Sequence, residues 1–253
     1  MIKKAIYFLL FCIILISIIG SLLAILRNYK VYRLTFTSTQ TWDPYLVFLH
    51  NETIHYIPDW QHHISIDPPP SNTAAQTKQE LKDLMFLQNT RTPEDIQNIL
   101  KEMYLPSMKF GDYFYGDYLD AIKFPKTSLL LHQAYSDLDT IILQLKSKYD
   151  RVRPIYLKSS LNPAIKVPDH PAYPSAHSTE AFFLAYVLSE LAPDRKYEFE
   201  SRAWEIAVNR ERAGVHYRSD TEGGKSLASQ YVTILLKNAE FKTLLEDAKS
   251  EWN

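Results

Sequence analysis

The segment Ala181–Leu188, AFFLAYVL, carries apolar side chains on every side of a helix. A helix of this kind is not suited to a protein surface, because it has no polar face to turn toward water. It belongs in the middle of a helical bundle, where other helices cover all of its sides. This one segment therefore favours a multi-helix core over other arrangements.

Start and stop signals for helices dominate the sequence around that segment. Thr92 supplies a capping hydroxyl ahead of a proline and two acidic residues, which together are typical of a helix start. Pro125 and Pro193 lie near other starts, and Gly214 follows a helix end. With the apolar periodicity, these signals predict helices over residues 74–88, 92–104, 126–147, 178–191, 194–212, 221–237 and 239–251. We predict an all-α fold, a compact helical bundle.

Length and composition fit one such domain with a short appendage. The chain has 253 residues, of which 46% are hydrophobic and 13% aromatic. Its 28 basic and 29 acidic residues give a net charge of -1, so no broad positive field points to nucleic acid as a partner. The single cysteine, Cys12, lies in the N-terminal apolar run, which leaves the folded part without a thiol for a disulfide, a zinc site or catalysis.

The N-terminus predicts export from the cytoplasm. Lys3 and Lys4 precede an uncharged apolar run over residues 5–26, which is long enough to span a bilayer as a helix. We interpret residues 1–30 as a membrane anchor or signal segment. A retained anchor is favoured, because the candidate cleavage site at Leu22 lacks a small residue at its first position. The folded domain is then expected on the periplasmic side, either anchored to the membrane or, if the segment is cleaved, secreted into the periplasm.

Two further segments follow the anchor. Residues 31–63 show short alternating patches without a sustained helical period, and we interpret them as a linker or extension. The run DPPPS over residues 67–71 is stiff and non-helical, because proline lacks an amide donor and restricts the residue before it. The compact domain is therefore expected over residues 64–253.

The first of three charged or nucleophilic clusters is Lys146 followed by Arg153 and Pro154, at the end of a predicted long helix. Two cations meet there at a proline-containing turn. The alternative is a solvated basic surface, because Lys148 and Arg151 are also nearby.

The second cluster, Pro174-Ser175-Ala176-His177, immediately precedes the most apolar helix. A helix start exposes unpaired amide donors and the positive end of the helix dipole, which suits a phosphate, and His177 would reach the bound group. The alternative is that Ser175 is an ordinary N-cap. His170 is close enough in sequence to border a substrate entrance.

The third cluster runs from Asn209-Arg210 to His216 and Asp220, across the helix end at Gly214. An aspartate four residues after a histidine can lie on the same helix face and accept its Nδ1 proton. That arrangement leaves Nε2 free as a nucleophile. The alternative is a surface pair that contributes little.

Together the clusters read K-x6-RP, PSxH and R-x5-H-x3-D, which resembles the signature of the phosphatidic-acid phosphatase type 2 superfamily, shared with vanadium haloperoxidases. The flanking segments IDPPPSNTAAQTKQELKDL, AYPSAHSTEAFFLAYVLSELAPDR and NAEFKTLLEDAKSEW resemble class A bacterial acid phosphatases, so the resemblance covers about residues 64–253. Two positions depart from the family pattern, which usually has glycine in place of Ala176 and serine in place of Asn209.

The resemblance implies a fold of the acid phosphatase and vanadium-dependent haloperoxidase type and a hydrolase that needs no metal or other cofactor. His216 would be the nucleophile that forms a phosphohistidine, Asp220 its orienting acceptor and His177 the general acid. Vanadate is expected to inhibit as a phosphate mimic. The phosphate-binding residues would be Lys146, Arg153, Ser175, Ala176 and Arg210, with the backbone amides of Ser175 and Ala176 and the Ser175 hydroxyl as donors.

Small phosphomonoesters are the substrates that this resemblance favours. Three alternatives stay open: a vanadium-dependent haloperoxidase, a lipid phosphate phosphatase, and a domain that only binds phosphate or a protein partner at the membrane. A homo-oligomer is also open, since relatives of this kind often form oligomers.

Overall fold

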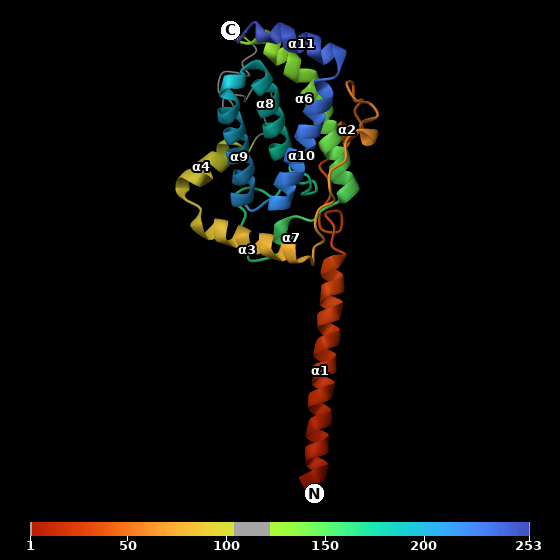
Figure 1. Cartoon of the computed structure of the whole chain (residues 1–253). Coiled ribbons are helices and arrows are strands. Elements are labelled where there is room, and N and C mark those ends of the chain that lie inside the picture. The colour runs from red at the N-terminus through yellow and green to blue at the C-terminus, as the bar shows by residue number, and fades with distance from the viewer. Residues whose placement is uncertain (1, 104–121, 253) are drawn as a thin grey trace.

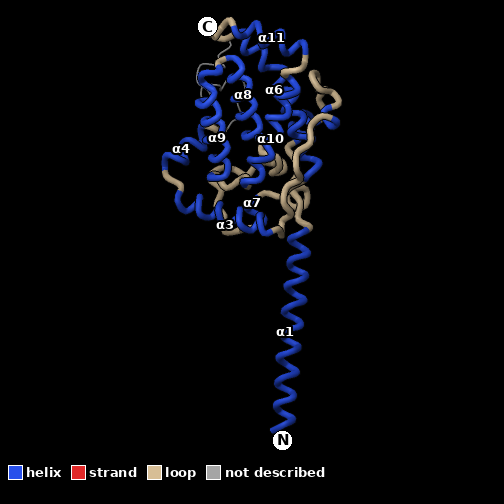
Figure 2. Tube along the Cα trace, viewed as in Figure 1, coloured by secondary structure: helices blue, strands red, loops and turns tan. Residues whose placement is uncertain are grey.

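The computed structural model describes residues 2–103 and 122–252. Within these ranges the regular structure is entirely helical, and Figure 2 shows helices joined by loops without a strand. The all-α prediction is confirmed. The α-helices are α1 (Ile2–Tyr32), α2 (Pro44–His50), α3 (Ala75–Thr90), α4 (Pro93–Lys101), α6 (Pro125–Tyr149), α7 (Pro154–Leu157), α8 (Ala176–Leu191), α9 (Lys196–Arg212), α10 (Arg218–Leu235) and α11 (Ala239–Lys249), with 3-10 turns η1 (Trp60–His62) and η3 (Pro193–Arg195).

Helix α8 lies at the centre of the bundle, as its sequence predicts. It packs chiefly against α9 and α10 and also contacts α6 and α11 (Figure 1). Phe183, Ala185 and Leu188 are fully buried in the main hydrophobic core. Burial of apolar surface of this kind contributes about 25 cal/mol per Å², so this helix is a major source of the stability of the domain.

Local sequence signals set most of the observed helix ends. Thr92 and Asp95 form a reciprocal capping box at the start of α4. Gly214 adopts a φ of 77°, the left-handed conformation that glycine tolerates, just after α9 ends. Helix α10 begins three residues earlier than predicted, because the Asp220 carboxylate accepts the Tyr217 amide and so caps its first turn. Helix α4 ends at Lys101, with Glu102 as its C-cap, three residues before the predicted end near Tyr104, a residue outside the described ranges.

Two glycines bring α10 close to the start of α8. A Cβ atom at Gly223 would lie 2.4 Å from the Tyr173 ring, and one at Gly224 would lie 2.8 Å from the Ser175 carbonyl oxygen. Real side chains do not make contacts this short. The absence of a Cβ at these positions therefore lets the segment before α8 pack directly against the first turns of α10.

The extension over residues 31–63 packs along α6 within the described part of the chain. The backbone amides of His55 and Tyr56 donate to the Asp137 carboxylate at 2.9 and 2.7 Å. The Trp60 indole donates to Gln144 at 2.8 Å, and its side chain is buried in the main core. These contacts tie the extension to the helical domain, whereas the boundary near residue 64 stays a prediction.

Helix α1 projects away from the bundle, as Figure 1 shows. Its 31 residues correspond to a length of about 46 Å at 1.5 Å per residue. Within it, residues 9–32 are long and apolar enough to cross a membrane. Leu10, Ile16 and Leu23 are exposed, as are most apolar side chains along this helix. The helix therefore has the length and surface that a membrane anchor requires.

Candidate active site

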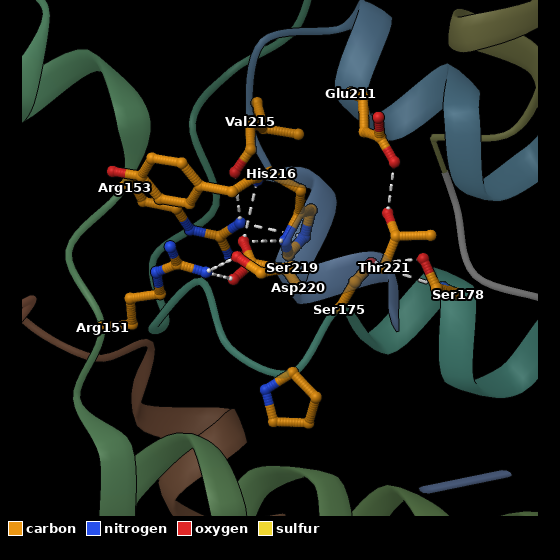
Figure 3. A network of polar contacts seen from close by, with 12 residues as sticks. Arg151, Arg153, Ser175, Ser178, Glu211, Val215, His216, Ser219, Asp220 and Thr221 are labelled. Carbon is orange, nitrogen blue, oxygen red and sulfur yellow. Dashed lines mark hydrogen bonds and ion pairs between the residues drawn. The ribbon is translucent and has the colours of Figure 1, made fainter. Parts of the chain in front are cut away.

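The three sequence clusters meet at one place in the fold. The end of α6, the turn before α7, the start of α8, the end of α9 and the start of α10 all contribute side chains to it. Figure 3 shows Arg153, Ser175, His216 and Asp220 together in one network of polar contacts. All eight predicted site residues lie in or beside this region, and all except His177 are buried: Lys146, Arg153, Ser175, Ala176, Arg210, His216 and Asp220.

Both ring nitrogens of His216 have hydrogen-bond partners, which hold the imidazole in place. Its Nδ1 lies 3.1 Å from Asp220 Oδ2, and its Nε2 lies 3.0 Å from Arg153 Nη1 (Figure 3). Because a guanidinium can only donate, Nε2 must accept, and Nδ1 therefore carries the proton that Asp220 accepts. This tautomer leaves the Nε2 lone pair directed at the cationic side of the site.

Asp220 is held by more than the histidine. Arg151 Nη1 donates to Asp220 Oδ1 at 2.5 Å, and the Tyr217 amide donates to Oδ2 at 3.0 Å. Burial alone would raise the pKa of Asp220, but the Arg151 charge and the hydrogen bond from His216 lower it below the usual range. Asp220 is therefore a carboxylate throughout the acidic range and stays an acceptor for His216.

The burial of Arg151 contradicts the alternative interpretation that placed this residue on a solvated basic surface. Its side chain is buried, stacks 3.9 Å from the Tyr217 ring centroid and also contacts Glu80 Oε2 at 3.3 Å. Glu80 in turn accepts the Ser219 amide at 2.8 Å. Lys148, by contrast, is exposed. Sequence reasoning missed Arg151 and Glu80 as site residues, because Asp220, the partner of Arg151, and Ser219, the partner of Glu80, both lie far along the chain.

Lys146 and Arg153 bring two cations into the buried site. Lys146 Nζ donates to the carbonyl oxygens of Pro171 and Pro174 at 2.9 and 2.6 Å. Burial, together with the charge of Arg153, lowers the pKa of Lys146 well below its ordinary value. Burial lowers the pKa of Arg153 to about 10, so it keeps its charge under acidic conditions. An anion between these groups would remove much of their mutual repulsion.

Arg210 offers further donors to such an anion. Its Nη2 donates to the Ile99 carbonyl oxygen at 3.1 Å and to Glu102 Oε2 at 3.2 Å. Its Nε and Nη1 are buried and have no hydrogen-bond partner among the described residues. Buried donors without partners are costly, which favours a bound acceptor at this position.

Glu102 is a further residue that the sequence did not single out. Its buried carboxylate accepts from Asn209 Nδ2 at 3.2 and 3.0 Å and from Arg202 Nη1 at 3.0 Å, as well as from Arg210. The Asn209 amide, which replaces the usual serine of the family pattern, is therefore used to orient the carboxylate that holds Arg210. No local motif marks Glu102, and its role depends on contacts with α9.

His177 lies in the first turn of α8, with its Nε2 at 2.8 Å from the Glu102 carbonyl oxygen. A carbonyl oxygen can only accept, so Nε2 carries a proton. Burial and the nearby charge of Arg210 lower the pKa of His177 well below its ordinary value. In the free site, His177 therefore carries a second ring proton, and with it a positive charge, only under acidic conditions.

The start of α8 provides the predicted donors for a phosphate except one, the backbone amide of Ser175. Ser175 is the N-cap, and its hydroxyl oxygen accepts from the Ser178 amide at 3.3 Å. Its backbone amide donates to the Asp220 carbonyl oxygen at 3.1 Å, so that donor is already used. The amides of Ala176 and His177 belong to the first helical turn, where they have no acceptor within the helix. The Ser175 hydroxyl and the Ala176 amide remain the predicted donors here.

His170 lies between Arg153 and an adjoining cavity. The Arg153 guanidinium donates to the His170 carbonyl oxygen at 3.0 Å and to its Nδ1 at 3.1 Å. The imidazole also lines a cavity that Lys146 and Ala176 share. This position matches the prediction that His170 borders an entrance to the site.

Comparison with known proteins identifies the class of this domain. Residues 127–243 match the PAP2 superfamily, and this range contains all eight predicted site residues. This match covers less than half of the chain, and within that range it confirms the resemblance to the superfamily that the three motifs carry.

Its curated relatives are named as acid phosphatases. The chain is 32% identical over 133 residues to a non-specific acid phosphatase of Providencia stuartii, covering 51% of this chain and 54% of that protein. It is 31% identical over 112 residues to the non-specific acid phosphatase of Salmonella typhimurium, covering 43% of this chain and 45% of the relative. The chain thus spans about half the length of the curated relatives it matches.

Solved structures with a similar fold include two vanadium-dependent haloperoxidases. A bacterial vanadium-dependent chloroperoxidase in its apo form gives a TM-score of 0.65 at 12% identity, over 83% of this chain and 57% of the other. A bacterial vanadium-dependent iodoperoxidase gives 0.55 at 21% identity, over 69% and 52%. At these identities the similarity shows the fold alone, and it agrees with the predicted bundle type.

Proposed function

We propose that this protein is an acid phosphatase that hydrolyses phosphate monoesters without a metal ion, through a phosphohistidine intermediate. The observation that carries the proposal is the orientation of His216, whose Nδ1 bonds to Asp220 while its Nε2 faces a guanidinium inside a cluster of buried cations. This arrangement supplies a neutral nucleophile beside an anion site, and the relatives named non-specific acid phosphatase support the activity, though not this mechanism in particular.

The phosphate would be held by charge and by oriented donors. Lys146, Arg153 and Arg210 would neutralise its oxygens, with the Ser175 hydroxyl and the first-turn amide of Ala176 completing the site. In other phosphoryl-transfer enzymes metal ions supply much of this stabilisation. Three buried cations can supply the same positive charge, which is why we propose a metal-independent reaction.

In the first step, the Nε2 lone pair of His216 would attack phosphorus, and the bond between phosphorus and the ester oxygen would break. The departing oxygen would take a proton from His177, whose other nitrogen stays hydrogen-bonded to Glu102. Nε2 becomes positive as it is phosphorylated, and the Asp220 carboxylate stabilises the ring through Nδ1.

In the second step, a water molecule would attack the phosphorus of the phosphohistidine. His177, now neutral, would accept the proton of that water, and the phosphorus–nitrogen bond would break with its electron pair returning to Nε2 of His216. The products are the alcohol and inorganic phosphate, and both histidines regain their starting states. An alcohol could attack the same intermediate in place of water.

The direct test is turnover of p-nitrophenyl phosphate by the full-length chain in detergent, at mildly acidic pH and with EDTA present. We expect hydrolysis, inhibition by vanadate, and a phosphoenzyme whose phosphate is labile in acid, as a phosphoramidate bond is. Loss of activity in EDTA that added metal restores would contradict metal independence. Halide oxidation that depends on added vanadate, without ester hydrolysis, would favour a haloperoxidase instead.

The buried histidines predict an acidic pH optimum. Burial and the charge of Arg153 lower the pKa of His216 to about 3, so the nucleophile stays neutral above that pH. His177 must be protonated to act, and its pKa in the free site is also lowered, so its acid form is lost as the pH rises toward neutrality. The pH profile of kcat/KM, which reports the free enzyme, should therefore peak well below pH 6.5. A flat or alkaline profile would contradict these roles.

Arg210→Met tests the proposed phosphate ligand. Removal of a charged group that makes two hydrogen bonds costs about 1.5–3 kcal/mol, so KM and the inhibition constant of inorganic phosphate should each rise roughly 10- to 100-fold. Arg202→Met is the matched control, because Arg202 also pairs with Glu102 but is partly exposed. If the two variants weaken phosphate binding equally, Arg210 acts only through Glu102.

We also propose that α1 anchors the domain to a membrane with the catalytic site on the periplasmic side. The length and exposed apolar surface of α1 support the anchor. Fractionation of cells that express the full chain, followed by protease treatment of spheroplasts, would test both points. Release of the protein from membranes by a salt wash would contradict the anchor. Resistance of the folded domain to protease added to spheroplasts would contradict the periplasmic location.

A further inference from the structure

A cavity of about 290 Å³ adjoins the proposed phosphate site and extends away from it. It lies between α2, α6 and α8, and its end nearest the site is lined by Lys146, His170 and Ala176. Leu49 and Ile142 give it apolar walls. Its volume is at the lower end of the roughly 300–1,000 Å³ typical of ligand pockets, which suits a small organic group.

Two carboxyl groups line the cavity beyond its apolar walls. Glu180 of α8 is fully buried, and Asp139 of α6 is partly buried; both face the cavity. The Tyr135 hydroxyl donates to Glu180 Oε2 at 2.6 Å. Glu180 Oε1 is buried without a donor among residues 2–103 and 122–252. When Glu180 and its neighbour Asp139 are both ionised, this oxygen has no donor, and an acceptor of this kind in a cavity favours a ligand that carries donor groups.

The two carboxyls lie within hydrogen-bonding reach of each other, an arrangement that requires one of them to be protonated. Burial raises the pKa of Glu180 to about 7, and burial together with the charge of Glu180 raises the pKa of Asp139 well above its usual range. Lys146 is the cation that faces Glu180 from α6, and it offsets only part of this effect. A second cation in the cavity would stabilise both carboxylates.

The helices set the spacing between the phosphate end and the carboxyl pair. Ala176 and Glu180 are one turn apart on α8, a rise of about 6 Å, whereas Asp139 and Lys146 are two turns apart on α6, a rise of about 10 Å. A phosphate ester at one end and a group bonded to the carboxyls would therefore be separated by an aromatic ring or a short alkyl chain. Leu49 and Ile142 supply apolar surface in the same cavity for such a spacer.

We propose that this cavity takes the alcohol portion of the substrate and that the Glu180–Asp139 pair binds an ammonium group on it. The inference rests on the proposed phosphatase function and narrows its substrate to phosphomonoesters of amino alcohols with an apolar spacer. An ammonium supplies three donors and one positive charge, which satisfies Glu180 Oε1 and replaces the shared proton.

Two esters of nearly the same shape test the proposal in the full-length protein: the phosphate ester of tyramine and 4-propylphenyl phosphate, which carries a methyl group in place of the ammonium. A charged hydrogen bond contributes about 1.5–3 kcal/mol, so kcat/KM should be roughly 10- to 100-fold higher for the amine. Glu180→Gln and Asp139→Asn should each reduce this ratio toward one. Glu190→Gln, at an exposed position of the same helix, should leave the ratio unchanged.

A ratio near one in the wild type would overturn the proposal, as would a ratio that survives in both cavity variants. If Glu180→Gln lowers kcat/KM equally for both esters, their ratio is unchanged. Such a result would show that the substitution acts only on the structure, and it would also contradict the proposal. If neither ester is hydrolysed, the proposed function fails. Calorimetric affinities of the same two esters for the wild type and Glu180→Gln, which need no turnover, then decide the ammonium site by the same ratio.

Discussion

Replacement of His216 by alanine should lower kcat on p-nitrophenyl phosphate by at least about 10⁴-fold, the scale at which loss of a nucleophile or its activating base acts in other covalent hydrolases. The physical reason is that Nε2 is the nitrogen held free of a proton inside the cation cluster. The phosphate site itself is left in place. The inhibition constant of inorganic phosphate should therefore change much less than kcat.

The His216→Ala variant leaves a space that a free imidazole can enter. If His216 is the nucleophile, added imidazole should restore part of the turnover, and the acid-labile phosphoenzyme should be absent without it. His132→Ala is the matched control, because His132 is exposed on α6. A variant that still forms the phosphoenzyme would place the nucleophile elsewhere.

Replacement of Asp220 by asparagine should lower kcat by about 10⁴-fold, the effect that the same change has in a catalytic triad. An amide can donate to Nδ1 as well as accept from it, so the tautomer that leaves Nε2 unprotonated is no longer enforced. The acid limb of the pH profile should shift as well, because the hydrogen bond and charge of Asp220 raise the pKa of His216. Its loss should move that limb to lower pH.

The same Asp220→Asn change should also destabilise the fold. Its effect on the free energy of unfolding should be larger than that of most other substitutions in the site. Arg151 is buried and bonded to Asp220 at 2.5 Å, and breaking a buried ion pair costs about 3–5 kcal/mol. Urea unfolding should show this loss in the free energy of unfolding. Arg151→Met combined with Asp220→Asn should regain part of it, because the buried guanidinium that lost its Asp220 partner is then removed. The recovery should be incomplete, because Glu80 loses its contact with Arg151. Equal stability of single and double variants would show that Arg151 does not depend on Asp220.

The sequence by itself determined most of the helices and the members of the candidate site, although it did not predict the short helices α2 and α7. Helix starts such as Thr92 and the end at Gly214 follow from side chains that act on their own turn of backbone, and these local effects can be derived from neighbours in the sequence. The apolar side chains on every side of α8 likewise required its burial. The three motifs also identified the residues that converge, because their residue types and spacing indicate an anion site without any knowledge of the distances between them.

The tertiary structure alone decided which groups hold the motif residues in place. Arg151 and Asp220 are 69 residues apart, and Arg210 and Glu102 are 108 apart, so no local pattern connects them. The Ser175 amide was predicted to bind phosphate, but the fold pairs it with the Asp220 carbonyl oxygen. The cavity beside the site is likewise formed by three helices from distant parts of the chain. Such contacts depend on how helices pack against one another, and that packing is set by the shape of the whole core.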